Sequence, residues 1–402
     1  MRIKSLFLFI FILSACAELA IGRLYDERLS IYGVNLSILI STVFLFTSIV
    51  LLSSIKRVAL NRPKTILFGF FMLLLIVNPI LWSVYGAYEY GIAKFLNFIF
   101  IIIPISVVIL ERFRYDEVKN IFLILLGLVF VLCFFAITGL FETPRPDGRI
   151  SILGGGPIVF ARWMGVGVLS LFFLPFKRKY IFRLLFILLF LVYCLVSGSR
   201  GPFVALILTF LIYLFLNFRR IFLRLILLSS FLIGLFFISN ISKDIAELGR
   251  TDRVFLNVAK RGGSSQSTQT RYELVDRSYD LMLNHPFGIG AGNWQIQANK
   301  HDPTHLMAHD YPHNLLLEII NEYGVLAGIL LLLFIIHVSY IGFAKMMNNI
   351  KNGSSLYPLL FYLWIFLFLN AMLSGSLNDS RLLIVTACCI LINTPLIINK
   401  NE

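Results

Sequence analysis

The histidines of this chain are concentrated in one stretch. Five of the six lie between His285 and His313. Four of them recur at every fourth residue, namely His301, His305, His309 and His313. Asp302 follows the first of these histidines, and Asp310 follows the third. On one uninterrupted helix this spacing would form a metal-binding stripe. Pro303 and Pro312 interrupt such a helix, because proline removes a backbone donor and restricts the residue before it. At most two imidazoles would then share a face, and a two-histidine pair needs further ligands, so we expect no metal site.

His313 and Asn314 open the next apolar run. A histidine in the first turn of a helix at the membrane surface could accept a proton from a hydroxyl group or donate one to an oxyanion. The alternative role is that of an interfacial capping residue. Glu318 and Glu322 follow four residues apart inside the same apolar run. We expect both carboxyl groups to face a polar cavity, because a charged group facing lipid is costly.

Arginines are the second group of chemical candidates. Arg200 lies between two apolar runs in the segment Ser197–Pro202, where glycine and proline hold the backbone in a defined turn. A guanidinium group suits a phosphate, because its planar fork donates two parallel hydrogen bonds and keeps its charge. The alternative is a cationic residue that anchors a helix end.

Further arginines are expected on the same side of the membrane as Arg200. They are Arg145, Arg149, Arg271 and Arg277, with Arg162 placed inside an apolar run. Gly154–Gly156, after Arg149, would let the backbone approach a ligand closely. Arg271 heads an amphipathic pattern over Thr270–Asn284, in which the pairs Leu274/Leu281 and Val275/Met282 recur at helical spacing. For Arg277 we prefer a solvent or headgroup contact, whereas an ionisable group such as Arg162 inside a span is a functional candidate.

The composition determines which elements carry these residues. The hydrophobic fraction is 58%, the charged fraction is 14%, and the mean hydropathy is +0.87. These values predict a polytopic membrane protein. A net charge of +14 would suggest nucleic acid as the partner of a soluble protein. Here the cationic runs separate apolar segments, so they indicate topology and contacts with anionic lipid, and we expect no nucleic-acid partner. The five cysteines lie in apolar runs and are expected to be packing residues.

Apolar runs of spanning length predict about twelve transmembrane helices. They lie at about 6–21, 34–54, 66–84, 93–110, 119–141, 158–175, 180–198, 202–217, 221–239, 315–341, 356–374 and 382–398. Leu13–Cys16 resembles a lipoprotein cleavage box, but we expect the first segment to be retained as a helix.

The positive-inside rule predicts cytoplasmic termini and one long external loop. The predicted division is an N-terminal bundle of about nine helices at 1–239, a loop at 240–312 and about three helices at 313–402. Gly262–Ser267 is expected to be a turn within the loop. Long translocated segments are largely exempt from the rule, so the arginines and lysines of this loop do not change the topology.

Four motifs and their order resemble the O-antigen ligase/polymerase superfamily. They are Ser199-Arg200-Gly201, the turn Pro286–Gly292, His313-Asn314 followed by Gly324, and the loop Ser374–Arg381. The resemblance covers the second half of the chain in motifs and the whole chain in layout. It implies an all-α polytopic membrane glycosyltransferase of the GT-C-like type, with amphipathic helices in the long periplasmic loop.

The resemblance also implies the chemistry. Members of this superfamily use lipid-pyrophosphate-linked glycans at the periplasmic face and need neither a metal nor a nucleotide sugar. By the resemblance, Arg200 and Arg271 would hold the pyrophosphate and His313 would assist the acceptor hydroxyl. The further substrate-binding candidates are Arg149, Arg162, Arg277, Asn314, Glu318 and Arg381. The expected partners are an undecaprenyl-pyrophosphate-linked oligosaccharide, membrane lipids and a chain-length regulator protein.

Polymerases and ligases of this superfamily differ in the acceptor, which is a second lipid-linked repeat unit or the lipid A-core. The Ser-Arg-Gly motif and the run after Pro312 resemble a Wzy-type polymerase more than a WaaL-type ligase. A flippase or other polysaccharide-lipid transporter could also have about twelve helices. A transporter would favour two comparable halves, so the single long loop between the ninth and tenth predicted helices favours an enzyme.

Overall fold

The computed structural model describes most of the chain. The described residues are 3–20, 27–31, 33–55, 60–143, 149–153, 155–175, 180–217, 263–298, 311–349 and 355–396. The chain divides into two compact units. Unit 1 comprises Met1–Gly22, Ser37–Ile124 and Arg271–Glu402, and unit 2 comprises Arg23–Leu36 and Leu125–Thr270.

Seven helices are long and apolar enough to span a membrane, counted over the described residues. They are α2 (Leu36–Ser53), α3 (Arg62–Tyr85), the continuous segment Glu89–Arg112, α6 (Tyr115–Thr138), α9 (Arg200–Asn217), α14 (Val325–Asn349) and α15 (Tyr357–Ser374). Segment Glu89–Arg112 consists of α4 (Glu89–Asn97), a π-helical turn (Phe98–Ile102) and α5 (Ile103–Arg112). Three shorter apolar helices are α1 (Ile3–Ala20), α7 (Pro157–Phe173) and α8 (Tyr180–Val196). The predicted all-α, multi-pass membrane fold is therefore confirmed.

The remaining elements are short or polar. The helices are α11 (Gly263–Asn284), α12 (Trp294–Ala298), α13 (Leu315–Tyr323) and α16 (Arg381–Leu391). Two 3-10 turns cover Glu27–Leu29 and Asn378–Ser380. Strands β1 (Ser30–Ile31) and β2 (Val34–Asn35) form a two-stranded antiparallel hairpin, with Ser30 opposite Asn35. This hairpin is a small addition to the predicted all-α fold.

Several boundaries differ from the predicted ones, including the end of α14, which lies at Asn349 and not at 341. The run 315–341 is two helices, because Gly324 between α13 and α14 has a φ of +89°. The last run ends as a helix at Leu391 instead of continuing to 398. Residues from Gly263 onward belong to α11, so the predicted turn there is wrong. The run 221–239 lies outside the described residues, and the total of twelve helices stays a prediction.

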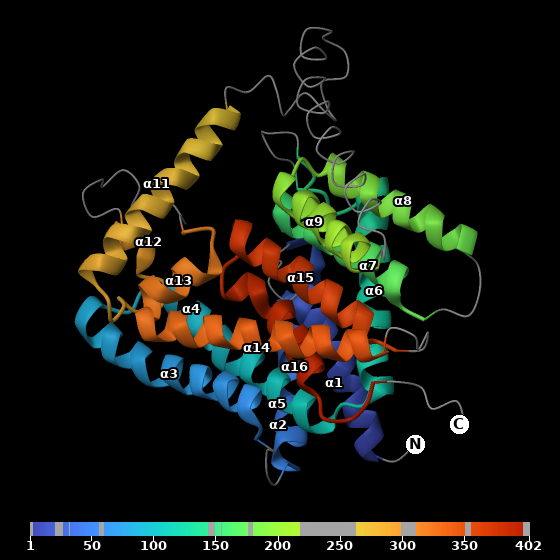
Figure 1. Ribbon diagram of the computed structural model, residues 1–402, viewed down its shortest axis with the longest axis horizontal. Coiled ribbons are helices and arrows are strands. Elements are labelled where there is room, and N and C mark those ends of the chain that lie inside the picture. The colour runs from blue at the N-terminus through green and yellow to red at the C-terminus, as the bar shows by residue number, and fades with distance from the viewer. Residues whose placement is uncertain are drawn as a thin grey trace, which may run out of the picture. The chain divides into compact units, whose positions relative to one another are not determined.

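The core of unit 1 is built around α14 and α16 (Figure 1). Helix α14 packs against α3, α13 and α15, and α16 packs against α5 and α15. Every residue of α16 is buried. A helix that is apolar on all sides is stable only when other elements surround it. Cys388 and Cys389 of α16 and Cys16 of α1 are buried and reduced, as expected for packing residues.

Unit 2 is built around α7, which packs against α8 and α9. Gly167 of α7 allows this packing. A Cβ atom at Gly167 would lie 2.7 Å from a side-chain carbon of Phe190 in α8 and 2.7 Å from one of Val129 in α6. The small residue therefore lets three apolar helices approach closely, as small residues do in membrane proteins generally.

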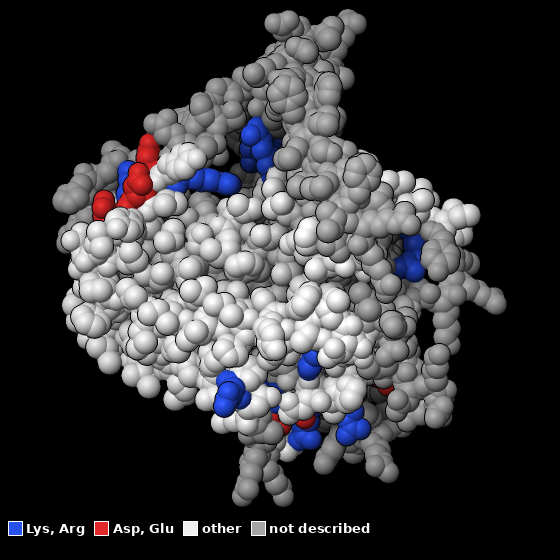
Figure 2. All heavy atoms as spheres, in the orientation of Figure 1, with Lys and Arg blue, Asp and Glu red and all other residues white. Residues whose placement is uncertain are grey.

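The outer surface of α3 and α14 is apolar. Exposed side chains on α3 include Ile76, Ile80 and Val84, which are 57%, 60% and 70% exposed. On α14, Leu326 and Ile329 are 59% and 49% exposed. Figure 2 shows no charged side chain over the middle of these helices, while charged side chains gather over α11 and near the N-terminal end of α3. Such a surface is suited to lipid.

Candidate functional site

The turn Pro286–Gly292 joins the ends of several helices in unit 1. The Ile289 N–H donates to the carbonyl of Asn321 at 3.0 Å, and the Gly290 N–H donates to that of Glu322 at 2.8 Å. The Pro286 carbonyl accepts from the N–H of Val325, the first residue of α14, at 2.9 Å. The turn therefore connects α11 to the end of α13 and the beginning of α14.

The glycines of this turn are required by backbone contacts. Gly288, Gly290 and Gly292 have φ values of +93°, +90° and +74°, which residues with a side chain rarely adopt. A Cβ atom at Gly292 would lie 2.4 Å from the Cα of Gly91 in α4. At Gly288 it would lie 2.6 Å from the backbone nitrogen of Gly324. The glycine motif thus holds α4 and α13 in place.

Helix α3 fixes the same turn through two polar side chains. The Asn78 side-chain oxygen accepts from the Ala291 N–H at 2.7 Å, and the Trp82 indole N–H donates to the Ala291 carbonyl at 3.1 Å. The Asn293 amide in turn donates to the carbonyl of Gly86, just after α3, at 3.0 Å. The ends of α3, α4 and α14 therefore meet at the turn on one side of unit 1, as the predicted loop pattern requires.

A buried ion cluster lies next to the turn. Lys94 of α4 is 1% exposed and pairs with both Glu318 and Glu322 of α13, which are 1% and 2% exposed. The second oxygen of Glu322 accepts from the Gly292 N–H at 2.9 Å. The second oxygen of Glu318 accepts from the Leu377 N–H at 2.8 Å. All four carboxylate oxygens are satisfied, as buried charges require.

This cluster replaces the polar cavity expected around the two glutamates. Burial raises the pKa of the Glu318 carboxyl above its ordinary value, although Lys94 opposes that shift. The Lys94 ammonium group lies between the two carboxyl groups and compensates negative charge inside the buried cluster. Lys94 was not among the predicted site residues. A single lysine within the apolar run 93–110 was the available signal, because charged residues in spans are rare and have specific roles.

Asn314 fixes the beginning of α13. Its side-chain oxygen accepts from the N–H groups of Leu316 and Leu317 at 3.0 and 3.1 Å, which is the N-cap arrangement. Its amide donates to the Met372 carbonyl of α15 at 3.1 Å. The predicted substrate-binding residue Asn314 therefore caps α13 and ties it to α15.

His313 has a left-handed backbone conformation, with φ at +53°. This conformation is uncommon for a residue other than glycine and is typical of functional positions when the surroundings enforce it. The half-buried imidazole lies against Tyr311, with 4.1 Å between the ring centroids. The cap at Asn314 and the ion cluster one and two helical turns further on hold the segment that carries His313.

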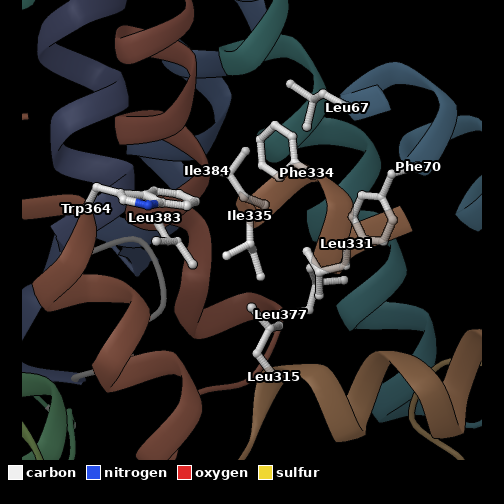
Figure 3. Close-up of a pocket in the computed structure, with 10 residues that line it drawn as sticks. All are labelled: Leu67, Phe70, Leu315, Leu331, Phe334, Ile335, Trp364, Leu377, Leu383 and Ile384. Atoms are coloured by element: carbon white, nitrogen blue, oxygen red, sulfur yellow. The ribbon is translucent and has the colours of Figure 1, made fainter. Parts of the chain in front are cut away.

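The other side of the first turn of α13 borders an apolar cavity (Figure 3). Leu315 and Leu377 line it together with side chains from α3, α14, α15 and α16: Leu67, Phe70, Leu331, Phe334, Ile335, Trp364, Leu383 and Ile384. The Trp364 indole N–H points to a partner outside the lining set, the Ser339 hydroxyl at 2.9 Å. An apolar cavity of this kind stays dry, so it does not bind a charged substrate.

Helix α11 carries Arg271 and Arg277. One face of it is buried: Leu274 and Leu281 form a core cluster with Ile289 and Trp294. The Trp294 indole N–H donates to the Ser278 hydroxyl on that face at 3.1 Å. Arg271 is exposed one turn before Leu274, and Arg277 is half-buried. The helix ends before His285, as predicted, and the His285 ring contacts the Tyr85 hydroxyl at 3.0 Å.

Unit 2 carries Arg149, Arg162 and Arg200. Arg200 is exposed and begins α9, directly after the turn at Ser197 and Gly198, where Gly198 has a φ of +72°. A Cβ atom at Gly198 would lie 3.1 Å from the Cγ of Arg149. The aliphatic part of Arg149 therefore lies over the turn that precedes Arg200, so the structure brings these two predicted residues together. Arg162 is half-buried on α7.

Arg381 is buried, with 4% of its surface exposed, and pairs with Glu18 of α1 at 3.2 Å. Glu18 also accepts a hydrogen bond from the Ser41 hydroxyl of α2 at 2.8 Å. The pair links the start of α16 to the first two helices. Cys16 of the lipobox-like segment lies buried in the same helix α1.

Most of the predicted histidine stripe lies outside the described residues, namely His301, His305 and His309. Arg145 and Gly154 also lie outside them. Over the part of the chain that the structure describes, no group of three histidine, cysteine or carboxylate side chains could hold a metal ion.

A family model described as O-antigen ligase matches residues 184–332. The matched region runs from α8 to the beginning of α14 and contains Arg200, Arg271, His313 and the glycine turn. A search of the curated proteins gives no match. The motifs, the membrane helices and this match agree, and together they support the O-antigen ligase/polymerase superfamily for the matched region.

Proposed function

We propose that the chain is a polymerase of lipid-linked oligosaccharide repeat units. It would transfer the growing glycan from undecaprenyl pyrophosphate to a sugar hydroxyl of an acceptor repeat unit at the periplasmic face of the inner membrane. The observation that carries the proposal is His313. It lies inside the region matched by the family model, has a left-handed backbone conformation and is held by the N-cap at Asn314.

The reaction breaks the bond between the anomeric carbon of the growing glycan and a pyrophosphate oxygen. A bond from the acceptor oxygen to that carbon forms, the hydroxyl proton leaves, and the lipid pyrophosphate departs with the bonding electron pair. Because the leaving group is already activated, the enzyme mainly has to orient two membrane-bound partners and stabilise the developing negative charge.

We assign the three central residues accordingly. Arg200 and Arg271 bind the pyrophosphate as charge-assisted hydrogen-bond donors, which suits two side chains that are exposed at helix beginnings or along a surface helix. His313 accepts the acceptor proton or orients the hydroxyl group. The position of Arg149 over the turn before Arg200 supports a second cationic group for the same anion.

The remaining predicted substrate-binding residues take mixed roles in this proposal. Asn314 and Glu318 act by positioning α13, because both are occupied by contacts within the protein. Arg381 acts in the same indirect way through its pair with Glu18. Arg162 and Arg277 are half-buried and remain candidates for contacts with the glycan or lipid.

In this proposal both termini lie in the cytoplasm, as the charge pattern of the loops predicts. A chain-length regulator protein is a partner, as the resemblance to the superfamily implies. It also makes the reaction independent of metal ions. Full elongation in the presence of a chelator is the expected result, and activity that is lost in chelator and restored by one divalent ion would contradict this part.

The description of the matching family as O-antigen ligase supports a second candidate, transfer of the glycan to lipid A-core. The surface glycan of a deletion strain separates the two. Loss of the polymerase leaves a single repeat unit on the lipid A-core. Loss of a ligase leaves an unmodified core and accumulated lipid-linked polymer, and that result would overturn the polymerase assignment.

A further inference from the structure

Helix α11 has two apolar faces. The buried face carries Leu274, Ser278 and Leu281, which are 4%, 0% and 7% exposed. At about 100° of rotation per residue, the opposite side of the helix carries Tyr272, Tyr279 and Leu283. These three side chains are 68%, 55% and 61% exposed. An amphipathic helix packed on its own protein needs only one apolar face, so the second face is available to a partner.

The exposed apolar face is continuous. Val275 lies beside Tyr279 on the helix surface and is 41% exposed, and Phe287 extends the face beyond the helix end with 83% of its surface exposed. We call Tyr272, Val275, Tyr279, Leu283 and Phe287 the outer face of α11.

Acidic side chains border the outer face on one flank only. Glu273, Asp276 and Asp280 are exposed. On the helix surface they lie between the outer face and Leu281 of the buried face. Figure 2 shows acidic side chains gathered over α11 next to uncharged surface. The helix therefore presents a sharp boundary between an apolar stripe and a charged stripe.

The position of the outer face relative to the spans of unit 1 identifies the partner. Phe287 packs against Gly324, with its backbone 2.7 Å from where a Cβ atom of Gly324 would lie. The next residue, Val325, begins the span α14. At the base of α11, His285 contacts Tyr85, the last residue of the span α3. The outer face therefore begins at the level where two membrane spans end.

Lipid-facing side chains of those spans lie at the same level. Val84 of α3 and Leu326 of α14 are 70% and 59% exposed, each within two residues of the helix end. The outer face of α11 therefore begins beside the exposed apolar ends of two spans. Its two tyrosines and one phenylalanine are the residue types that concentrate where the hydrocarbon region meets the lipid headgroups.

We propose that the outer face of α11 docks into the headgroup–acyl boundary of the bilayer leaflet at which α3 ends and α14 begins. The acidic flank would then face water, and α11 would lie along the membrane with its buried face toward the protein. Arg271, next to Tyr272, would be kept at headgroup depth. The proposal does not depend on the proposed function.

Site-directed spin labelling tests the proposal directly. All five native cysteines are buried, so a cysteine introduced on α11 is the accessible thiol. We would label Tyr279→Cys and, as a matched control, Asp280→Cys, in full-length protein in nanodiscs of phosphatidylethanolamine and phosphatidylglycerol. Collision of each label with oxygen, which partitions into lipid, is compared with collision with a water-soluble nickel chelate.

We expect the label at position 279 to collide more often with oxygen than with the nickel chelate. We expect the label at position 280 to collide more often with the nickel chelate than with oxygen. Equal access of the nickel chelate to both labels would overturn the proposal. The proposal would also be overturned if the label at position 279 became shielded from the nickel chelate only after lipid-linked glycan is added, which would identify the glycan as the partner. Shielding only when two copies share a nanodisc would instead identify a second copy of the chain. The pair Tyr272→Cys and Glu273→Cys repeats the comparison at the N-terminal end of the outer face, in case a variant of the first pair fails to fold.

Discussion

At the scale of single residues, His313 combines the features that point to chemistry. Its backbone is left-handed, its neighbour Asn314 caps a helix, and the segment lies in the region matched by the O-antigen ligase family. Its identity as a candidate was predictable from its place after Pro312 at the head of an apolar run. Its backbone conformation was not, because a positive φ outside glycine depends on contacts that the local sequence does not encode.

We predict that His313→Ala lowers the elongation rate by at least about 100-fold, the range expected when a general acid–base group is removed. His337 provides the matched control, because it is a half-buried histidine of α14 whose ring contacts the Leu333 carbonyl of its own helix. His337→Ala should elongate normally. Initial rates with lipid-linked repeat units measure both, and equal rates for the two variants would remove His313 from the site.

At Arg200 the geometry of the donor matters as well as its charge. Lysine keeps the charge but loses the bidentate fork, so Arg200→Lys should retain only part of the activity. Arg200→Ala should lose about 100- to 1,000-fold, as for removal of one donor to a developing anion. Membrane levels of the protein should match the wild type in both. An unchanged glycan-length distribution in cells expressing only Arg200→Ala would exclude the pyrophosphate role.

At the scale of elements, the sequence predicted the apolar helices better than the contacts between them. Helix α13 separates from α14 because Gly324 packs on the backbone of Phe287, a contact between segments 37 positions apart that hydropathy cannot show. The partner of Arg381 is Glu18, from the opposite end of the chain. Lys94 pairs with two carboxylates of α13, which lie more than 220 positions away in the sequence.

The glycine turn gives a prediction about stability. In Gly292→Ala the new Cβ would lie 2.4 Å from the Cα of Gly91, at a φ of +74°. Overpacking of this kind costs about 1–3 kcal/mol. Gly127→Ala in α6 is the matched control, because nothing lies within 4 Å of its Cβ position. Thermal unfolding in detergent should show a lower Tm for Gly292→Ala alone. A similar Tm for both variants would refute the packing role of the turn.

The ion cluster gives a second prediction at this scale. Lys94→Met leaves Glu318 and Glu322 buried beside each other, and breaking a buried pair from one side costs about 3–5 kcal/mol. Replacing all three residues, Lys94→Met with Glu318→Gln and Glu322→Gln, removes the charges together and should recover part of the lost Tm. Equal losses in the single and triple variants would show that the charges of the cluster do not govern its stability.

At the scale of the whole molecule, the composition was sufficient to predict a multi-pass membrane protein, and the motifs predicted the superfamily that the match over residues 184–332 supports. The number of spans was less predictable, because a short apolar helix such as α16, which is buried on all sides, has the same hydropathy as a lipid-facing span.

The most direct test of the polymerase assignment is a reaction of the purified protein in nanodiscs with lipid-linked repeat units, without a membrane gradient. We predict a ladder of longer lipid-linked glycans, with one undecaprenyl pyrophosphate released for each bond formed. Repeat units that remain single in nanodiscs, but cross the membrane of vesicles containing the same protein, would contradict the enzyme and support a transporter.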